Sequence, residues 1–288
     1  MSYLLLRFAS SFFTGILMTQ AGSLVQLASR NILASPSTLG FDGIAIFWIL
    51  LIHSLFLWLG SDHHTVLVFS GLGIFVFLGF IVPPMIRGDQ RFERIILIGL
   101  AFNLFISAVY SLWHFLFLAF NLPFPAELWF GHFRYSNEEG LFFLILGQIL
   151  LTIFLIKKFN LLQVFSLGED FCLNWNLSEK TLYRLIIWGA GCSTFIVVSF
   201  FGAFSLLGLI FPIFARKFWF QRYDLKGELF IGPILNGILL MILDALCYFF
   251  PIFGAEIPVG LIVIIVGAVS LIGILFRSQK QSKLLANL

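Results

Sequence analysis

The chain has 288 residues, of which 60% are hydrophobic and 11% are charged, and its formal net charge is +3. Its mean hydropathy is +1.03. A soluble fold of this size could not bury so much apolar surface, because charged residues cover most of the outside of a soluble protein. The composition therefore excludes a soluble globular protein and indicates an integral membrane protein.

Apolar runs long enough for membrane-crossing helices recur along the whole chain. A crossing needs about 17–25 residues, and the sequence predicts crossings at 4–26, 43–60, 66–86, 95–120, 140–156, 229–252 and 257–276. The run 185–215 holds 31 uncharged residues. As one helix it would rise about 46 Å, whereas the bilayer core is about 30 Å thick. It is therefore predicted to cross twice, with an outer turn near Gly202 to Gly208, which gives an all-α polytopic membrane protein of nine segments.

Basic residues favour one side of this topology. If the loops after the odd-numbered segments are cytoplasmic, they contain 15 of the 17 lysines and arginines, as the positive-inside rule requires. Only Arg7 and Arg134 then face outward. The sequence therefore predicts an N-terminus outside the membrane and a C-terminus inside it.

Few side chains in the predicted segments could carry chemistry. Asp244 is the one acid in the middle of a segment, while Asp42 and Glu256 lie near segment ends. An ion-coupled carrier needs ionisable groups within the membrane, so that class is disfavoured, and we interpret Asp244 as a structural group that bonds a neighbouring helix. The sequence also contains no phosphate loop, HExxH or GxSxG motif. Energy for any transport must therefore come from a partner.

Histidines and cysteines give no metal signature. Their spacing matches no recognised ligand set, so we predict interfacial histidines, small buried cysteines, no bound metal and no cofactor. The histidines are His53, His63, His64, His114 and His132, and the cysteines are Cys172, Cys192 and Cys247.

The longest predicted cytoplasmic loop runs from Lys157 to Arg184 and mixes apolar with acidic residues. Its pattern predicts two short helices broken around Gly168, followed by a helix start near residue 179. Exposed apolar side chains in such a loop either form a docking surface for a partner or hold interfacial helices on the membrane. Both interpretations stay open on the residues alone. The apolar side chains concerned are Leu162, Phe165, Leu167 and Phe171.

Four stretches form an ordered set of motifs: GSLVQLASRNILASPSTLG (22–40), FNLLQVFSLGEDFCLNW (159–175), GLIFPIFAR (208–216) and EIPVGLIVIIVGA (256–268). Together they resemble the signatures of the FecCD-type permeases, the membrane subunits of ABC importers for iron-siderophores, haem and cobalamin. The chain departs from the family pattern at Ile32, Cys172 and Ile213. It also begins at what resembles the second of ten family segments. The resemblance therefore implies a ten-helix type II ABC importer permease fold without its first helix.

The resemblance implies a function and its partners. Residues 1–288 would form a single transmembrane permease domain in the bacterial inner (cytoplasmic) membrane, with a cytoplasmic coupling loop at about 158–184. The chain would act as a homodimer with two cytoplasmic ABC ATPase subunits and an extracytoplasmic substrate-binding protein, and it would have no enzymatic activity, cofactor or nucleic-acid partner of its own. The implied cargo is a ferric siderophore, with haem or cobalamin as the alternative. Because a segment is missing, a truncated paralogue that serves as a membrane scaffold or sensor is the alternative from another class.

The resemblance also implies roles for particular residues. Pro36 ends helical geometry and holds the residue before it extended, in a loop that forms an inner gate in the family. The implied gate residues are Asn31, Leu33, Ala34, Ser35 and Pro36, and the implied ATPase-coupling residues are Leu167, Gly168, Glu169 and Asp170. Arg7 matches an outward-facing arginine that pairs, in relatives, with acids of the binding protein and would orient docking. Tyr248 stands where some relatives carry a second docking arginine.

Overall fold

The computed structural model describes residues 2–59, 92–121, 129–168, 171–172, 175, 179–219, 224–251 and 254–286. The elements in these ranges are helices, as the sequence predicts. The α-helices are α1 (Tyr3–Ser29), α2 (Phe41–Leu59), α5 (Phe92–Ala119), α6 (Glu138–Leu167), α8 (Glu179–Phe201), α9 (Leu207–Phe214), α10 (Gly232–Phe249) and α11 (Val259–Ala286). Two short π-helical segments are η3 (Ala215–Trp219) and η4 (Gly227–Ile231).

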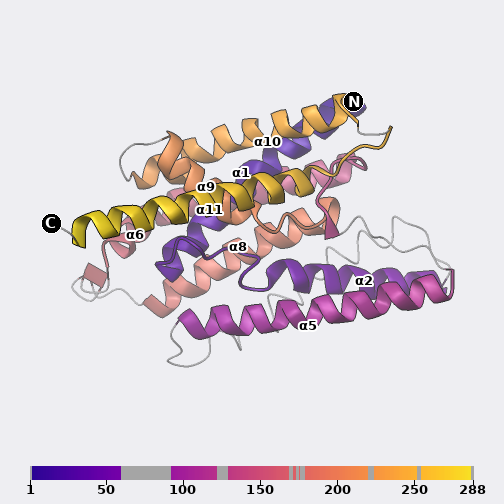
Figure 1. The fold of residues 1–288 in the computed structure, drawn as a ribbon, viewed down its shortest axis with the longest axis horizontal. Helices are drawn as coiled ribbons and strands as arrows, with labels where there is room; N and C mark the ends of the chain where they lie inside the picture. Colours follow the sequence, from indigo (N-terminus) through magenta and orange to yellow (C-terminus); the bar gives the residue numbers. More distant parts are fainter. Residues whose placement is uncertain are drawn as a thin grey trace.

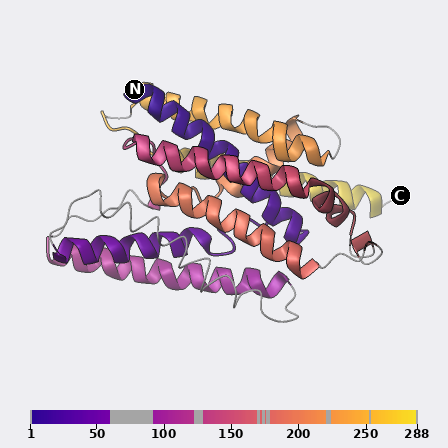
Figure 2. The same cartoon turned by 180° about the vertical axis from the view of Figure 1, so that it is seen from behind.

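The helices lie roughly side by side along the long direction of the molecule, and α1 runs through the middle of them (Figures 1 and 2). Helix α1 packs against α6, α8, α9 and α10, while α2 packs against α5 and α8. Most of α1 is buried, including its polar side chains. A helix that is largely buried can carry polar groups through a membrane protein, because neighbouring helices rather than lipid surround most of it.

Five of the described helices are long and apolar enough to cross a membrane, namely Tyr3–Ser29, Leu97–Ala119, Glu138–Leu167, Leu182–Phe201 and Gly227–Phe249. Shorter apolar helices occur at Phe41–Ile52 and Val259–Gly273. The predicted segment 66–86 lies outside the described residues. The predicted number of nine crossings therefore stays a prediction.

The long apolar run 185–215 is broken where the sequence predicts a turn. Helix α8 ends at Phe201, Gly202 has a φ of +79°, and α9 begins at Leu207. The second limb differs from a full crossing, because α9 has 8 residues and η3 has 5. Together they rise about 20 Å, less than the bilayer core. Pro212 lies inside α9 and removes one backbone donor, which accounts for a short and irregular helix.

Helix α6 corrects the predicted start of the long cytoplasmic loop. The segment expected to end at residue 156 continues as helix to Leu167. Consequently, Leu162 and Phe165 are buried side chains of α6, and the expectation that they are exposed in a loop was wrong. The predicted break around Gly168 is confirmed, since Gly168 follows the last residue of α6 with a φ of +121°. The predicted helix start near residue 179 is confirmed as well, because α8 begins at Glu179.

Amide side chains bond to the backbone of the irregular region after α8. Gln26 donates to the carbonyl of Leu209 at 3.0 Å, and Gln20 donates to the carbonyl of Leu229 at 3.0 Å. On α10, Asn236 donates to the carbonyl of Phe211 at 2.7 Å. Water cannot solvate broken backbone inside a bilayer, so such side-chain donors make a short, π-containing segment tolerable at that depth.

Gly22 on α1 touches the backbone of Gly208 directly. A β-carbon at Gly22 would overlap the carbonyl oxygen of Gly208 and would lie 2.8 Å from Cγ of Pro212. Only glycine therefore allows α1 and α9 to approach this closely.

We expect Gly22→Ala to destabilise the protein by about 1–3 kcal/mol, because even a methyl group must push α9 away from α1. The matched control is Gly273→Ala, since a β-carbon at Gly273 would meet no atom of the described residues within 4 Å. Thermal unfolding of the detergent-purified variants measures the difference. Equal midpoints for the two variants would contradict this account of the contact.

Candidate functional site

The segment between α1 and α2 begins with an ordered turn. Arg30 ends α1 in a left-handed conformation, with φ 49° and ψ 28°. The Asn31 side-chain oxygen accepts a hydrogen bond from the Leu33 amide at 2.9 Å, and the Asn31 carbonyl accepts one from the Ala34 amide at 3.1 Å. Asn31 thus holds the turn together, as expected for an amide beside broken helical backbone.

The second half of this segment is buried. Ala34 and Ser35 are each 1% exposed, and Pro36 is buried too. The hydroxyl of Thr38 donates to the Ser35 carbonyl at 2.8 Å and accepts from the Ser35 amide at 2.9 Å. The predicted gate residues therefore divide into two groups, with Asn31 and Leu33 exposed and the other three packed inside the protein.

Pro36 and its neighbour Ser37 connect this segment to the start of α9 and to α5. Figure 1 shows α2 beginning well inside the outline of the molecule, so the segment runs back into the bundle from the end of α1. A β-carbon on Gly208 at the start of α9 would lie 3.0 Å from Cδ of Pro36. The Ser37 hydroxyl donates to the carbonyl of Ser205, and the Asn103 amide of α5 donates to the carbonyl of Ser37. A movement of α9 or α5 would thus displace this segment directly.

Two of the four predicted coupling residues lie at the end of α6. Leu167 is 59% exposed, and a β-carbon on Gly168 would meet no atom of the described residues within 4 Å. Glu169 and Asp170 lie outside the described residues. Further along, Phe171 and Trp175 are exposed. Exposed apolar groups therefore do occur at this end of the molecule, which is the surface expected for a docking partner.

Arg7 is buried, with an exposure of 2%, and does not stand free at a rim. Its Nε and Nη2 atoms donate to the two carboxylate oxygens of Asp244 on α10, each at 2.8 Å. Its Nη1 donates to Glu256, just before α11, at 2.9 Å. The interpretation of Asp244 as a structural group that bonds a neighbouring helix is confirmed. The pairing of Asp244 with Arg7 was not predicted from the sequence.

The aromatic ring of Tyr248 completes this cluster. The Arg7 guanidinium carbon lies 4.8 Å from the ring centroid, a distance at which a cation and a ring attract each other. Tyr248 is thus a partner of Arg7 within the same chain. The cluster of Arg7, Asp244, Tyr248 and Glu256, called the outer ion cluster below, ties α1 to α10 and to the segment before α11.

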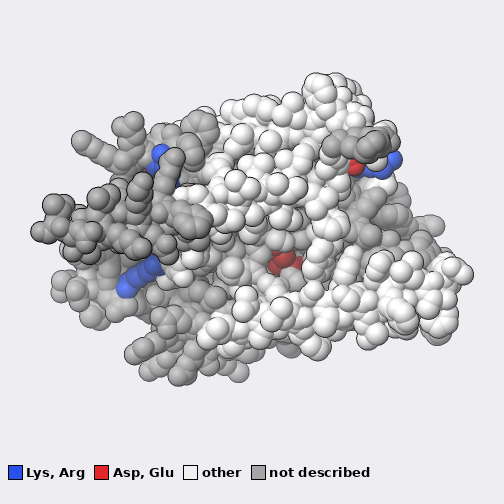
Figure 3. All heavy atoms as spheres, in the orientation of Figure 1, with Lys and Arg blue, Asp and Glu red and all other residues white. Residues whose placement is uncertain are grey.

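Basic side chains gather at the opposite end of α1. Arg216 lies 3.4 Å from Glu228 and also donates to Gln26 near the end of α1. Arg30 and Lys226 both lie over aromatic rings of α6. In Figure 3 the lysines and arginines that can be seen lie at both ends of the visible face, while its middle shows one small acidic patch among residues without charge. Arg30, Arg216 and Lys226 thus lie near the end of α1 that the positive-inside rule would assign to the cytoplasm.

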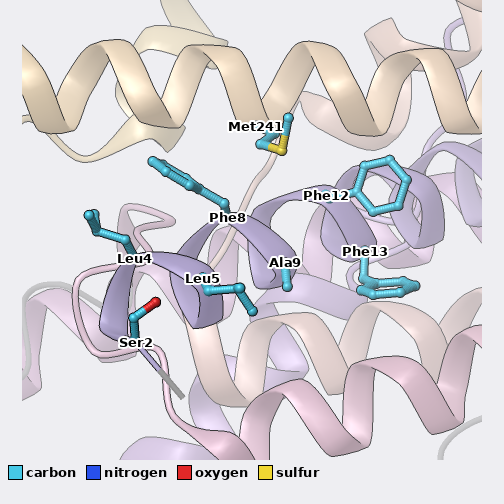
Figure 4. A pocket seen from close by; sticks show the side chains of 8 residues that line it. All are labelled: Ser2, Leu4, Leu5, Phe8, Ala9, Phe12, Phe13 and Met241. Carbon is cyan, nitrogen blue, oxygen red and sulfur yellow. The ribbon is translucent and has the colours of Figure 1, made fainter.

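A groove of about 450 Å³ lies between α1 and α10 near the chain's N-terminus. Figure 4 shows Phe8 and Phe12 reaching from α1 toward α10, which contributes Met241. Apart from Ser2, the lining side chains are apolar. The groove therefore offers contacts for an apolar occupant and lacks the convergent polar groups that hold a charged ligand. Within the described ranges, no three histidines, cysteines or acids lie close enough to hold a metal ion.

Two solved structures share this fold. A structure described as an inward-facing conformation of a metal-chelate type ABC transporter superposes with a TM-score of 0.78 at 21% identity, covering 95% of this chain and 85% of that one. PsaBC from Streptococcus pneumoniae, in complex with Fab, superposes with a TM-score of 0.60 at 15% identity, covering 93% and 89%. The all-α fold is therefore that of ABC importer permeases.

Curated relatives are permease proteins of import systems. The Iron(3+)-hydroxamate import system permease protein FhuB of Escherichia coli (strain K12) is 27% identical over 281 residues, 96% of this chain but 41% of FhuB. The chain thus spans about two fifths of that relative. The Petrobactin import system permease protein FatD of Bacillus anthracis is 27% identical over 94% of this chain and 79% of FatD. The Vitamin B12 import system permease protein BtuC of Photorhabdus laumondii subsp. laumondii is 24% identical over 93% and 78%. The model of the FecCD transport family matches residues 1–277, and the chain belongs to this family.

Proposed function

We propose that this chain is the permease subunit of an ATP-driven importer for an iron complex, most simply a ferric siderophore. The observation that carries the proposal is the family match over residues 1–277. Two relatives, named for iron(3+)-hydroxamate import and for petrobactin import, support the cargo class. Five long apolar helices support a multi-pass membrane protein, which we place in the bacterial inner membrane. The chain itself would not be an enzyme, because ATP hydrolysis would belong to a partner.

Cobalamin is the second candidate cargo. The relative from Photorhabdus is named as a vitamin B12 import permease and matches 93% of this chain. Haem stays an alternative of the same type. The alternative from another functional class is a non-transporting membrane scaffold or sensor. On that alternative, none of these compounds would be taken up.

The proposed assembly is a homodimer with two ATPase subunits at the basic end and a substrate-binding protein at the end that holds the outer ion cluster. The exposed Leu167, Phe171 and Trp175 support a docking surface for the ATPase. In this proposal residues 158–184 form the coupling loop, of which 158–167 are the last turns of α6, and the single domain spans residues 1–288. ATP binding and hydrolysis would move this surface and thereby switch the dimer between outward-open and inward-open states.

The proposed inner gate is the segment Asn31 to Pro36. Its exposed half could close against the same segment of a second copy, while its buried half contacts α9 through Pro36 and Gly208. We propose that displacement of α9 opens or closes the exposed half. The interleaved hydrogen bonds of Ser35 and Thr38 support this role, because they make the segment move as a unit.

We propose that Arg7 supports binding-protein docking indirectly, by holding the outer ends of the helices in place. Its low exposure and its two acidic partners in the same chain support this reading over a direct contact with the binding protein.

Uptake into proteoliposomes tests the main proposal. Vesicles that hold the chain with its cognate ATPase and binding protein are offered ferric siderophore, haem and cobalamin in competition. We expect ATP-dependent accumulation of the ferric siderophore. Accumulation of cobalamin or haem alone would mean that this compound, and not a ferric siderophore, is the cargo. Hydrolysis of ATP without uptake of any compound would refute the importer assignment.

Replacement of Leu167, Gly168 and Glu169 together by alanine tests the coupling surface. We expect ATP-dependent uptake to fall at least about tenfold, because the substitution removes an exposed apolar anchor at a protein interface. The matched control is Leu150→Ala, which removes a leucine of the same helix that is 60% exposed. Uptake equal to that of the unaltered chain would show that these three residues do not belong to the interface with the ATPase.

The variant Asp244→Asn separates the two possible roles of Arg7. If Arg7 acts indirectly, loss of the Asp244 charge lowers both thermal stability and affinity for the binding protein, because a buried cation loses its bidentate partner. If Arg7 contacts the binding protein directly, the same variant releases the guanidinium and leaves affinity unchanged or higher. We expect the first result, measured as binding-protein affinity at low and high salt beside thermal unfolding. A higher affinity that weakens with salt would restore the direct role.

A further inference from the structure

Arg30 occupies a backbone conformation that is unfavourable for its residue type. Its φ of 49° lies in the left-handed region, where helices usually end with glycine or asparagine because other side chains crowd the backbone. An arginine at such a position costs stability unless its side chain makes a compensating contact. The contact that Arg30 makes therefore calls for an explanation.

The Arg30 guanidinium lies over a ring at the end of α6. Its central carbon is 5.6 Å from the centroid of Phe165, within the range of a cation–π interaction. Phe165 is 1% exposed and stands two residues before α6 ends at Leu167. The start of the gate segment is thus attached to the last turn before the proposed coupling surface.

The same ring also contacts the helix on the far side of that surface. Phe165 and Tyr183 pack edge to face, with centroids 5.3 Å apart and planes at 88°. Tyr183 lies in the first turns of α8, which begins at Glu179. Phe165 therefore touches the entry to the gate segment and joins both flanks of residues 168–178.

Bonds beyond Arg30 extend this attachment into the gate. The Ser29 hydroxyl is 3.2 Å from the Asn31 carbonyl, and the Asn31 carbonyl accepts from the Ala34 amide. Pro36 then meets Gly208. A displacement of α6 and α8 can therefore pass along this chain of contacts to the buried half of the gate.

We propose that Arg30 is a positioning residue that links the proposed coupling surface to the proposed gate through the Phe165 ring. This inference rests on the proposed function. It adds a specific mechanical connection, in which the gate follows the ends of α6 and α8 because Arg30 holds it to them.

Variants of Arg30 test the link by the number of substrate molecules taken up per ATP hydrolysed. Arg30→Met keeps the length of the side chain and removes its charge, and Phe165→Leu removes the ring. We expect each to lower uptake per ATP about two- to fivefold, the effect of losing one cation–π contact, while ATP hydrolysis continues. Arg30→Lys keeps a cation and should retain most of the coupling.

Lys226→Met is the matched control. The Lys226 ammonium lies 5.8 Å from the centroid of Phe159, a ring of the same helix α6, but Lys226 is far from the gate segment in the chain, whereas Arg30 directly precedes it. Uptake per ATP should stay at the unaltered value in this variant. Equal coupling in Arg30→Met and the unaltered chain would overturn the link, and so would a loss of uptake that only follows a loss of thermal stability.

A second measurement needs no transport. Spin labels at Leu33 and Leu167, in a chain whose three cysteines are replaced, report the distance between gate and coupling surface in detergent. We expect a narrow distance distribution that broadens with Arg30→Met and not with Lys226→Met. An unaltered chain that shows this narrow distribution but no ATP-dependent uptake would refute the proposed function and leave the link standing. An identical distribution in all variants would refute the link alone.

Discussion

Polar groups at membrane depth must find their hydrogen-bond partners within the protein, and the central helix carries many such groups. Helix α1 brings Arg7, Gln20 and Gln26 through the interior, and each finds its partner on another helix or on irregular backbone. An unsatisfied polar group at membrane depth costs several kcal/mol. The positions of α9, η4 and α10 around α1 are therefore tied to those of its polar side chains.

Two kinds of polar interaction hold α1 to its neighbours. Near the N-terminus, a guanidinium pairs with two carboxylates, so Arg7, Asp244 and Glu256 fix three segments through charge. Deeper in, neutral amides bond backbone carbonyls of α9 and η4. A buried ion pair is costly to break once formed, whereas a single neutral hydrogen bond contributes only about 1 kcal/mol. The N-terminal end of α1 is therefore held by a bidentate ion pair, whereas Gln20 and Gln26 each hold the irregular backbone by a single hydrogen bond.

The predictions from the sequence are correct where the signal is local or averaged over many residues. The apolar runs predicted helices, the 31-residue run without charge predicted the break at Gly202, and the motifs predicted the family. The prediction is wrong at the end of α6, because the lysines at 157 and 158 marked a loop whereas the helix continues to Leu167. Lysine is a good helix former and marks a membrane boundary rather than a helix end.

The pairings of the candidate site could not be predicted from the sequence, because they join residues far apart in the chain. Arg7 and Asp244 are separated by 237 positions, and nothing local to either residue reveals the other. The rare combination of one cation and one acid inside predicted crossings was the available signal, since such charges usually pair. The contact between Arg30 and Phe165 depends likewise on where the ends of α1 and α6 come together.

The glycine contact between α1 and α9 has a mechanical consequence. Most helix pairs interlock through ridges of side chains that fit into grooves, which resist sliding and fix the crossing angle. At Gly22 and Gly208 the backbones meet with no side chain between them. No side-chain ridge therefore separates the two helices at this point. The direct contact therefore transmits any displacement of α9 along α1, and Pro36, which packs on the same Gly208, is placed to shift with it.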